Sequence, residues 1–228
     1  MKQLILFSII LILGIGSCYS KGKSAEQGSY PKFVTSENRI DSVAIDNEYV
    51  KVMLISTICS QAHTLGFGTR VIVALADLEI EGSNGNKKLK RGGIAVFQEN
   101  ESYKKPNGEY FEVAFKTNHP PYKGPEEWLK PVKNKIVYED KQFRVFEEIL
   151  DPGETRPLHS HNQRVVVKLN PARLTDPRFN EEGNKKGSLQ VPNSVKFAEP
   201  IVHVVQNISE VPLYNIVIEF IVPVMEKN

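Results

Sequence analysis

The sequence contains an internal repeat, which constrains its fold more than any other feature. When the chain is aligned with itself at a shift of 94 residues, Asp46 falls on Asp140 and about thirty positions stay in register without a gap. The segment 70–75 reads R-V-I-V-A-L, and the segment 164–169 reads R-V-V-V-K-L. Because a charged residue keeps its place beside each apolar run, chance alternation does not explain the match. The repeat predicts two copies of one structural unit.

Each copy reads as a series of short strands separated by turns. Polar residues at 84–88 and 183–186 are typical of turns between antiparallel strands, and Gly93 falls on Gly187 just beyond them. We expect strands at about 49–57, 69–80, 93–97 and 110–116 in the first copy, and at about 143–150, 159–169, 188–191, 201–206 and 213–222 in the second. No segment after the N-terminal apolar run has the pattern of a long amphipathic helix. Many short strands predict an all-β fold of two sandwiches or barrels in tandem.

The N-terminus resembles a lipoprotein signal. Met1 and Lys2 precede an apolar run at 4–15, which is too short for a permanent membrane-spanning helix and is typical of a secretion signal. The sequence I-G-S-C at 15–18 resembles the lipobox of bacterial lipoproteins. That resemblance implies that 1–18 is a lipoprotein signal peptide with Cys18 as the lipidated residue, and that a lipid bilayer holds the protein in the cell envelope, on the periplasmic side or at the cell surface. The alternative is an ordinary signal peptide with a chance cysteine.

Two features divide the remainder of the chain. Residues 19–40 begin with a polar stretch without period, which predicts a flexible tether. The segment 118–125 reads N-H-P-P-Y-K-G-P, which can neither continue a strand nor start a long helix. We therefore expect a first barrel at 41–122, a linker at 123–136 and a second barrel at 137–228. Cys59 has no cysteine partner in the mature chain and is expected to be a small buried apolar residue.

The composition is that of a globular protein. Hydrophobic residues make up 40% and charged residues 25% of the chain, with a formal net charge of +2. The lysines and arginines are dispersed rather than gathered in a stripe with aromatic residues. We therefore expect no nucleic-acid partner.

Two histidines on one predicted strand offer half of a metal site. Alternate side chains of a strand share a face, so His159, His161, Gln163 and Val165 are expected to point the same way. Neutral imidazole is a common ligand of zinc, iron, copper and nickel. The remaining ligands must come from another part of the chain.

These residues belong to two motifs that resemble those of the cupin superfamily. Gly153 is followed after five residues by H-S-H at 159–161, similar to G-x5-H-x-H-x3-4-E, and H-V-V-Q-N at 203–207 is similar to the H-x3-N of the second motif, P-x-G-x2-H-x3-N. The resemblance implies a bicupin of two small jelly-roll barrels. It also implies that His159, His161 and His203 of the second barrel hold a divalent transition metal, Fe, Zn, Ni or Cu. Three ligands leave coordination positions open for water, oxygen or a substrate.

The sequence departs from the family pattern at the acidic ligand. That ligand falls here on Val165 or Val166, and inward parity selects Val165. In the second motif, A-E-P-I-V at 198–202 lacks the family's glycine. A three-histidine site without a carboxylate resembles that of thiol dioxygenases in the cupin superfamily, which bind ferrous iron. Gln163 either orients a ligand or a metal-bound water, or is simply a polar wall residue.

The first copy has no histidines at the matching positions. At the shift of 94 residues, Leu65 and Phe67 take the places of His159 and His161, so no metal is expected there. The repeated arginines at 70 and 164 have the opposite parity to the histidines. We expect them between the two halves, bonded to one of the repeated aspartates.

Three functions are compatible with these features. One is a metal-binding bicupin that acts on a small organic molecule as a dioxygenase or an isomerase. Another is a non-enzymatic protein that binds a small-molecule ligand at the same place, and the third is a structural module. No residue beyond the ligands stands out as a catalytic acid or base, and Glu147, Glu148 and Glu154 are expected to be solvated. A homodimer is compatible with the sequence, since jelly-roll edges often pair.

Overall fold

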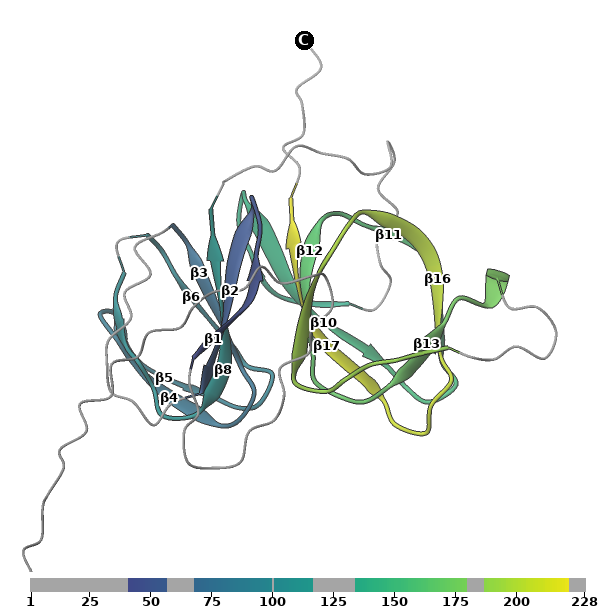
Figure 1. Ribbon diagram of the computed structural model, residues 1–228, viewed down its shortest axis with the longest axis horizontal. Coiled ribbons are helices and arrows are strands. Elements are labelled where there is room, and N and C mark those ends of the chain that lie inside the picture. Colours follow the sequence, from purple (N-terminus) through teal and green to yellow (C-terminus); the bar gives the residue numbers. More distant parts are fainter. Residues whose placement is uncertain (1–40, 57–67, 100, 117–133, 180–186, 222–228) are drawn as a thin grey trace, which may run out of the picture. The chain divides into compact units, whose positions relative to one another are not determined.

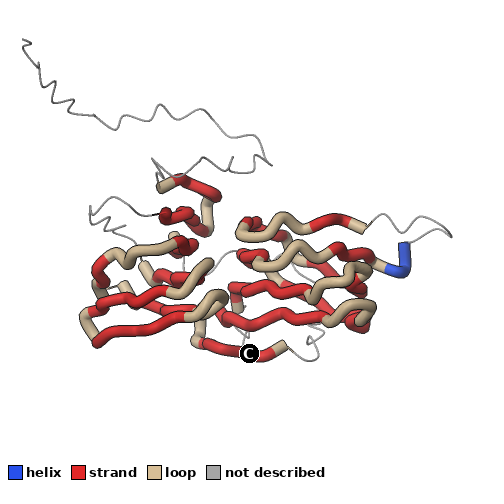
Figure 2. The backbone as a smooth tube through the Cα atoms, turned by 90° about the horizontal axis from the view of Figure 1, so that it is seen from below, coloured by secondary structure: helices blue, strands red, loops and turns tan. Residues whose placement is uncertain are grey.

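The computed structural model describes residues 41–56, 68–99, 101–116, 134–179 and 187–221. Several expectations concern residues outside these ranges: the signal peptide with Cys18, the tether, Cys59, the two apolar residues at 65 and 67, and most of the linker. In the described ranges the regular structure is β-strand apart from one short 3-10 helix, so the all-β expectation is confirmed (Figures 1 and 2). No helix there is long and apolar enough to cross a membrane.

The described residues of the first half form eight strands in two antiparallel sheets. The strands are β1 (Ser42–Asp46), β2 (Val50–Ser56), β3 (Arg70–Ala74), β4 (Leu78–Gly82), β5 (Gly85–Leu89), β6 (Ile94–Phe97), β7 (Tyr103–Lys104) and β8 (Glu109–Phe115). One sheet has the order β1-β2-β8-β3-β6 and the other has the order β5-β4-β7.

The second half repeats this arrangement, with nine strands in the part of it that the structure describes. They are β9 (Lys135–Glu139), β10 (Phe143–Leu150), β11 (Thr155–His161), β12 (Arg164–Lys168), β13 (Arg173–Thr175), β14 (Ser188–Leu189), β15 (Ser194–Ala198), β16 (Ile201–Asn207) and β17 (Leu213–Phe220), with the 3-10 helix η1 (Pro177–Phe179) after β13. One sheet has the order β15-β12-β17-β10-β9 and the other has the order β11-β16-β13-β14. Each half is therefore a barrel built from a larger and a smaller sheet.

The two five-stranded sheets share one hydrophobic core. Val71, Val73 and Val113 of the first half belong to the same buried cluster as Val145 and Val167 of the second. Aromatic rings join the halves as well, and the rings of Phe115 and Phe143 stack with their centroids 4.5 Å apart. Each fully buried aliphatic or aromatic side chain contributes roughly 1.5–3 kcal/mol relative to an exposed one. Both halves accordingly belong to one compact unit.

The repeat is real, but its register differs from the ungapped alignment. Backbone pairing places Arg70 opposite Ala114 and Arg164 opposite Glu219, so the arginines are equivalent as expected. At the start of each copy, the side chain of Asn47 accepts from the backbone N–H of Val50, as that of Asp140 does from Phe143. Asp140 therefore corresponds to Asn47, and its match with Asp46 was wrong by one residue.

The predicted match between the two glycines is also wrong. Ile94 pairs with Val73, and Val195 pairs with Val167, which makes Ile94 and Val195 equivalent. Gly93 therefore corresponds to Ser194, because the connection between β13 and β15 is longer than its counterpart. An alignment without gaps cannot follow such an insertion.

Candidate metal centre

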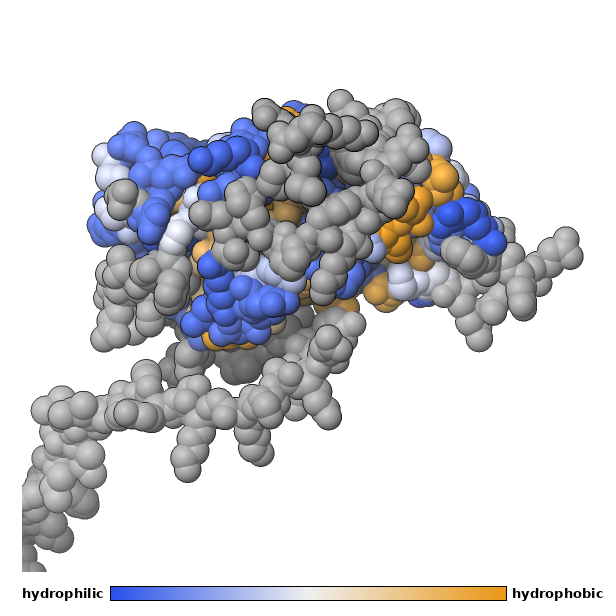
Figure 3. Space-filling model, turned by 90° about the horizontal axis from the view of Figure 1, so that it is seen from above, coloured by the Kyte–Doolittle hydropathy of each residue, from blue (hydrophilic) through white to orange (hydrophobic). Residues whose placement is uncertain are grey.

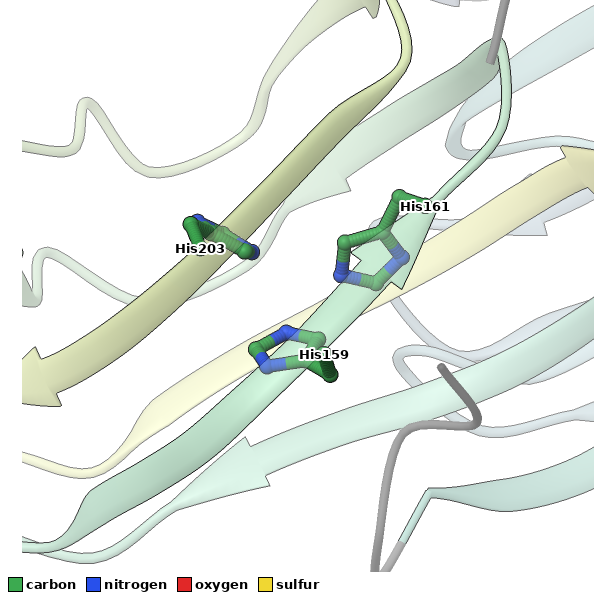
Figure 4. Close-up of side chains that lie close together, drawn as sticks. All are labelled: His159, His161 and His203. Atoms are coloured by element: carbon green, nitrogen blue, oxygen red, sulfur yellow. The ribbon is translucent and has the colours of Figure 1, made fainter. Parts of the chain in front are cut away.

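Three histidines from two neighbouring strands converge inside the second barrel. β11 and β16 pair antiparallel with His159 directly opposite His203, and His161 lies two residues further along β11. One ring nitrogen of each residue lies within 4.8 Å of those of the other two. Figure 4 shows the three rings facing one another from β11 and β16. The structure thus brings together all three residues that the sequence predicted as ligands.

A β-bulge and a glycine shape the strand that carries two of these histidines. Gly153 has a φ of 78°, a left-handed conformation that favours glycine, in the turn that leads into β11. The pairing register then shifts between Arg156, opposite Val205, and His159, opposite His203. Three residues on β11 thus face two on β16, which puts Arg156 and His159 on one face.

The hydrogen bonds of His159 leave its Nε2 free to bind a metal. Its Nδ1 lies 2.8 Å from the carbonyl oxygen of Pro157, which can only accept, so Nδ1 carries the proton. Nε2 keeps its lone pair, and it is buried with no hydrogen-bond partner among the described residues. Nε2 of His203 is likewise buried without such a partner. Buried polar atoms are rarely left unbonded, so these two nitrogens fit a site that receives a ligand.

Burial keeps two of the imidazoles in the form that metals bind. Burial and the neighbouring rings of His159 and His161 lower the pKa of His203 to about 3. Burial also lowers the pKa of His159. Both rings are therefore neutral near pH 7, with a lone pair available for a cation.

Glu219 orients the third histidine, and sequence reasoning missed it. The carboxylate of Glu219 is fully buried and lies 3.4 Å from Nδ1 of His161. It also accepts from the backbone N–H of Asn162 at 2.6 Å and pairs with Arg144 at 3.3 Å. Burial by itself raises the pKa of Glu219, but its hydrogen bond with His161 and the nearby charges outweigh this and lower it. Metal-binding histidines commonly have such a carboxylate behind them. The available signal was one acidic residue in the otherwise apolar run 216–220.

The prediction that Val165 lines the site is wrong. Val165 packs in the cluster between the two halves, whereas Val166 packs with Phe146 and Val217. The ring of Phe146 stacks on His161 at 6.1 Å, so Val166 has the inward position. The alternation is broken because the chain turns between the end of β11 and the start of β12.

Gln163, like Val165, lies on the opposite face from the one that the sequence predicted. Its side-chain amide donates to Glu199 at 3.2 Å and interacts with Tyr49 of the first half. Tyr49 in turn stacks on Phe197 at the contact between the halves. The structure therefore places Gln163 at that contact and not with the three histidines.

The predicted role of the repeated arginines is also wrong. Arg164 donates to the carbonyl oxygen of Glu199 at 2.9 Å and shares the inward face of β12 with Val166. Arg70 donates to the carbonyl oxygen of Glu101, and its guanidinium lies 5.5 Å from the ring centre of Tyr103. Neither bonds a repeated aspartate in the described structure, because both arginines occupy barrel interiors rather than the contact between the halves.

The strands that carry the histidines also present exposed apolar residues. Ile201 on β16 pairs with His161 and is 41% exposed, and Leu158 on β11 is 49% exposed. Seen from above, most of the described surface is hydrophilic, with a group of hydrophobic residues on the side of the second half (Figure 3). His203 on β16 is partly buried, whereas His159 and His161 are buried.

Comparisons with known proteins identify the fold. No protein-family model matches the sequence, and no curated protein matches it. A cupin 2 conserved barrel domain protein from Leptotrichia buccalis has a similar structure, with a TM-score of 0.54 and 14% identity over 82% of this chain and 92% of the other. AerE from Microcystis aeruginosa is similar with a TM-score of 0.52 and 16% identity over 77% and 89% of the two chains. The chain therefore has the cupin fold, in two cupin-like barrels with a candidate three-histidine metal site in the second.

Proposed function

We propose that the protein binds a divalent transition metal through His159, His161 and His203 and acts there on a small organic molecule. The convergence of three ring nitrogens, two of them buried without a hydrogen-bond partner among the described residues, carries this proposal. A chance group of buried histidines would satisfy its nitrogens with protein partners.

The donor set limits the choice of metal. Three imidazole nitrogens suit zinc, iron, copper and nickel, whereas calcium and magnesium prefer oxygen. When bound, such a metal would supply Lewis-acid or redox chemistry at the positions that the protein leaves open. The protein's own residues hold the rings: Pro157 fixes His159, Glu219 fixes His161, and the pairing of β11 with β16 sets His203 against them.

Metal content tests this proposal. The full-length chain, extracted in a mild detergent, is supplied with iron, nickel, zinc or copper and then analysed for bound metal. About one metal ion per chain is expected for the native protein and close to none for His161→Ala. Leu158→Ala, an exposed change on the same strand, should keep the native content. Near-zero metal in all three proteins would exclude the proposal.

A second assay separates an enzyme from a binding protein. Oxygen consumption by the metal-loaded protein is measured with small thiols and diols, since a dioxygenase consumes oxygen with its substrate. Consumption that is lost in His161→Ala would support a dioxygenase. Tight binding of a small ligand without turnover would instead favour the non-enzymatic alternative.

We further propose that the protein is anchored to the membrane of the cell envelope through lipidated Cys18. The apolar run at 4–15 and the lipobox-like sequence that follows support this proposal. A polar segment from residue 19 would separate the barrels from the bilayer surface, so the metal site would work outside the cytoplasm on molecules that reach the envelope.

A further inference from the structure

A second buried carboxylate lies in the interior of the second barrel. Glu148 on β10 is 8% exposed, and the side chain of Asn215 donates to it at 2.9 Å. No lysine or arginine nitrogen of the described residues lies within 4.0 Å of its carboxylate. A buried charge is costly unless it is paired or faces a metal. Glu219 forms such an ion pair with Arg144, whereas Glu148 has none within this distance among the described residues.

Strand alternation directs Glu148 toward the histidines. Phe143 and Val145 on β10 pack in the cluster between the halves, so the opposite face of this strand turns into the barrel. Phe146 is on that inner face, where its ring stacks on His161. Glu148 lies two residues further along and shares that face.

The electrostatics agree with this placement. The negative charge of Glu148 raises the pKa of both His159 and His203, although burial outweighs it and lowers both. Burial raises the pKa of Glu148 itself. The nearby His161, the hydrogen bond from Asn215 and the positive charges of Arg156 and Arg164 outweigh burial, so the pKa of Glu148 is lowered. The ionised form of the carboxylate is thus favoured, and its charge acts on all three histidine rings.

We propose that Glu148 supplies the negative charge that balances a metal held by the three histidines. It would replace the acidic ligand that the cupin motif places on β12, where this chain has Val165 and Val166. Glu148 is not among the residues whose ligand atoms lie within 4.8 Å of one another, so its role is that of a counter-charge beside the ligand set. This inference rests on the proposed function, since it requires a metal at the histidines.

The test is the affinity of the full-length protein for a metal alone. Zn²⁺ and Ni²⁺ are titrated into the metal-free native protein, Glu148→Gln and Glu147→Gln. Glutamine keeps the shape and can accept from Asn215, but it removes the charge. Glu147 is the matched control, since it is the adjacent residue and bonds Lys135 at 3.2 Å near the surface.

Glu148→Gln should bind both metals roughly 10–100-fold more weakly, as is usual for residues behind the ligands. Glu147→Gln should stay within about twofold of the native affinity. Glu148→Asp should recover part of the loss, because it restores the charge, and it also serves if the glutamine variant does not fold. Native affinity in Glu148→Gln, with the native protein binding metal, would overturn this inference alone. Failure of the native protein to bind metal would overturn the proposed function and this inference with it.

Discussion

His159 lies directly opposite His203 in the antiparallel pair of β11 and β16, with their ring centroids 4.5 Å apart. Two residues that are 44 positions apart in the sequence thus lie side by side on neighbouring strands of one sheet. Packing two imidazoles together away from water favours the neutral form of both. This relationship determines how the site should respond to pH, to metals and to substitution.

The metal-free protein should lose stability as the pH falls from about 6.5. The pKa of His203 is about 3 in the folded chain and about 6.5 when unfolded, so the unfolded state binds the extra proton between these values. The contribution of neutral His203 to the free energy of unfolding is fully present above pH 6.5. Below that pH it declines by at most about 1.4 kcal/mol per pH unit. Urea unfolding with a chelator should show a steeper decline between pH 6.5 and 5 for the native protein than for His203→Leu. Equal slopes would contradict the assignment.

Metal binding should raise the melting temperature in a histidine-dependent way. A metal that binds only the folded state, present at 100 times its Kd, stabilises that state by about 2.7 kcal/mol. Thermal unfolding with and without Zn²⁺ should show this shift in the native protein and in Leu158→Ala. His159→Ala should show little shift, and a chelator should reverse the effect. An equal shift in His159→Ala would place the binding elsewhere.

Glu219→Gln should destabilise the metal-free protein by about 3 kcal/mol. The change removes the ion pair of Glu219 with Arg144, which is also buried, and breaking one side of such a pair leaves a charge uncompensated. Glu147→Gln, which affects a more exposed pair, should cost less than about 1 kcal/mol. Urea denaturation measures both. A change below 1 kcal/mol in Glu219→Gln would mean that the ion pair contributes little.

The two barrels should unfold together. Phe143 stacks on Phe115 of the first half within a shared core, so Phe143→Ala should cost about 3–5 kcal/mol and keep one transition. Ile149→Ala on the same strand is the control, because Ile149 is 46% exposed. Calorimetry of the native protein should give a single peak. Two separate transitions would show that the shared core does not couple the halves.

Membrane attachment should depend on Cys18. After cell fractionation the native protein should be found in the membrane fraction and incorporate labelled fatty acid, since the acyl chains supply the affinity for the bilayer. Cys18→Ser should incorporate no label and lose the attachment that the acyl chains provide. Cys59→Ser is the matched control and should behave as the native protein. Label in Cys18→Ser would rule out lipidation at that residue.

The sequence predicted the fold class and the pair His159 and His161 from local patterns, and it predicted His203 from the resemblance to the second cupin motif. Apolar runs between turns predicted the strands. His159 and His161 are two residues apart, so they share a face in any strand that contains both. Val165 was misplaced because alternation holds only within one strand, and the chain turns between β11 and β12. The expectation that Glu148 is solvated was wrong, since Glu148 is buried, and Glu219 was not singled out. The position of each depends on how β10 and β17 pair with distant strands, which the periodicity of one strand does not reveal.

X-ray absorption at the zinc edge of the zinc-loaded, full-length protein tests the central claim most directly. The account predicts a zinc shell that contains three imidazole nitrogens at about 2.0–2.1 Å. In His203→Ala the imidazole count should fall to two, or zinc should be lost. A shell without imidazole, or one that is unchanged in His203→Ala, would contradict the assignment of this site.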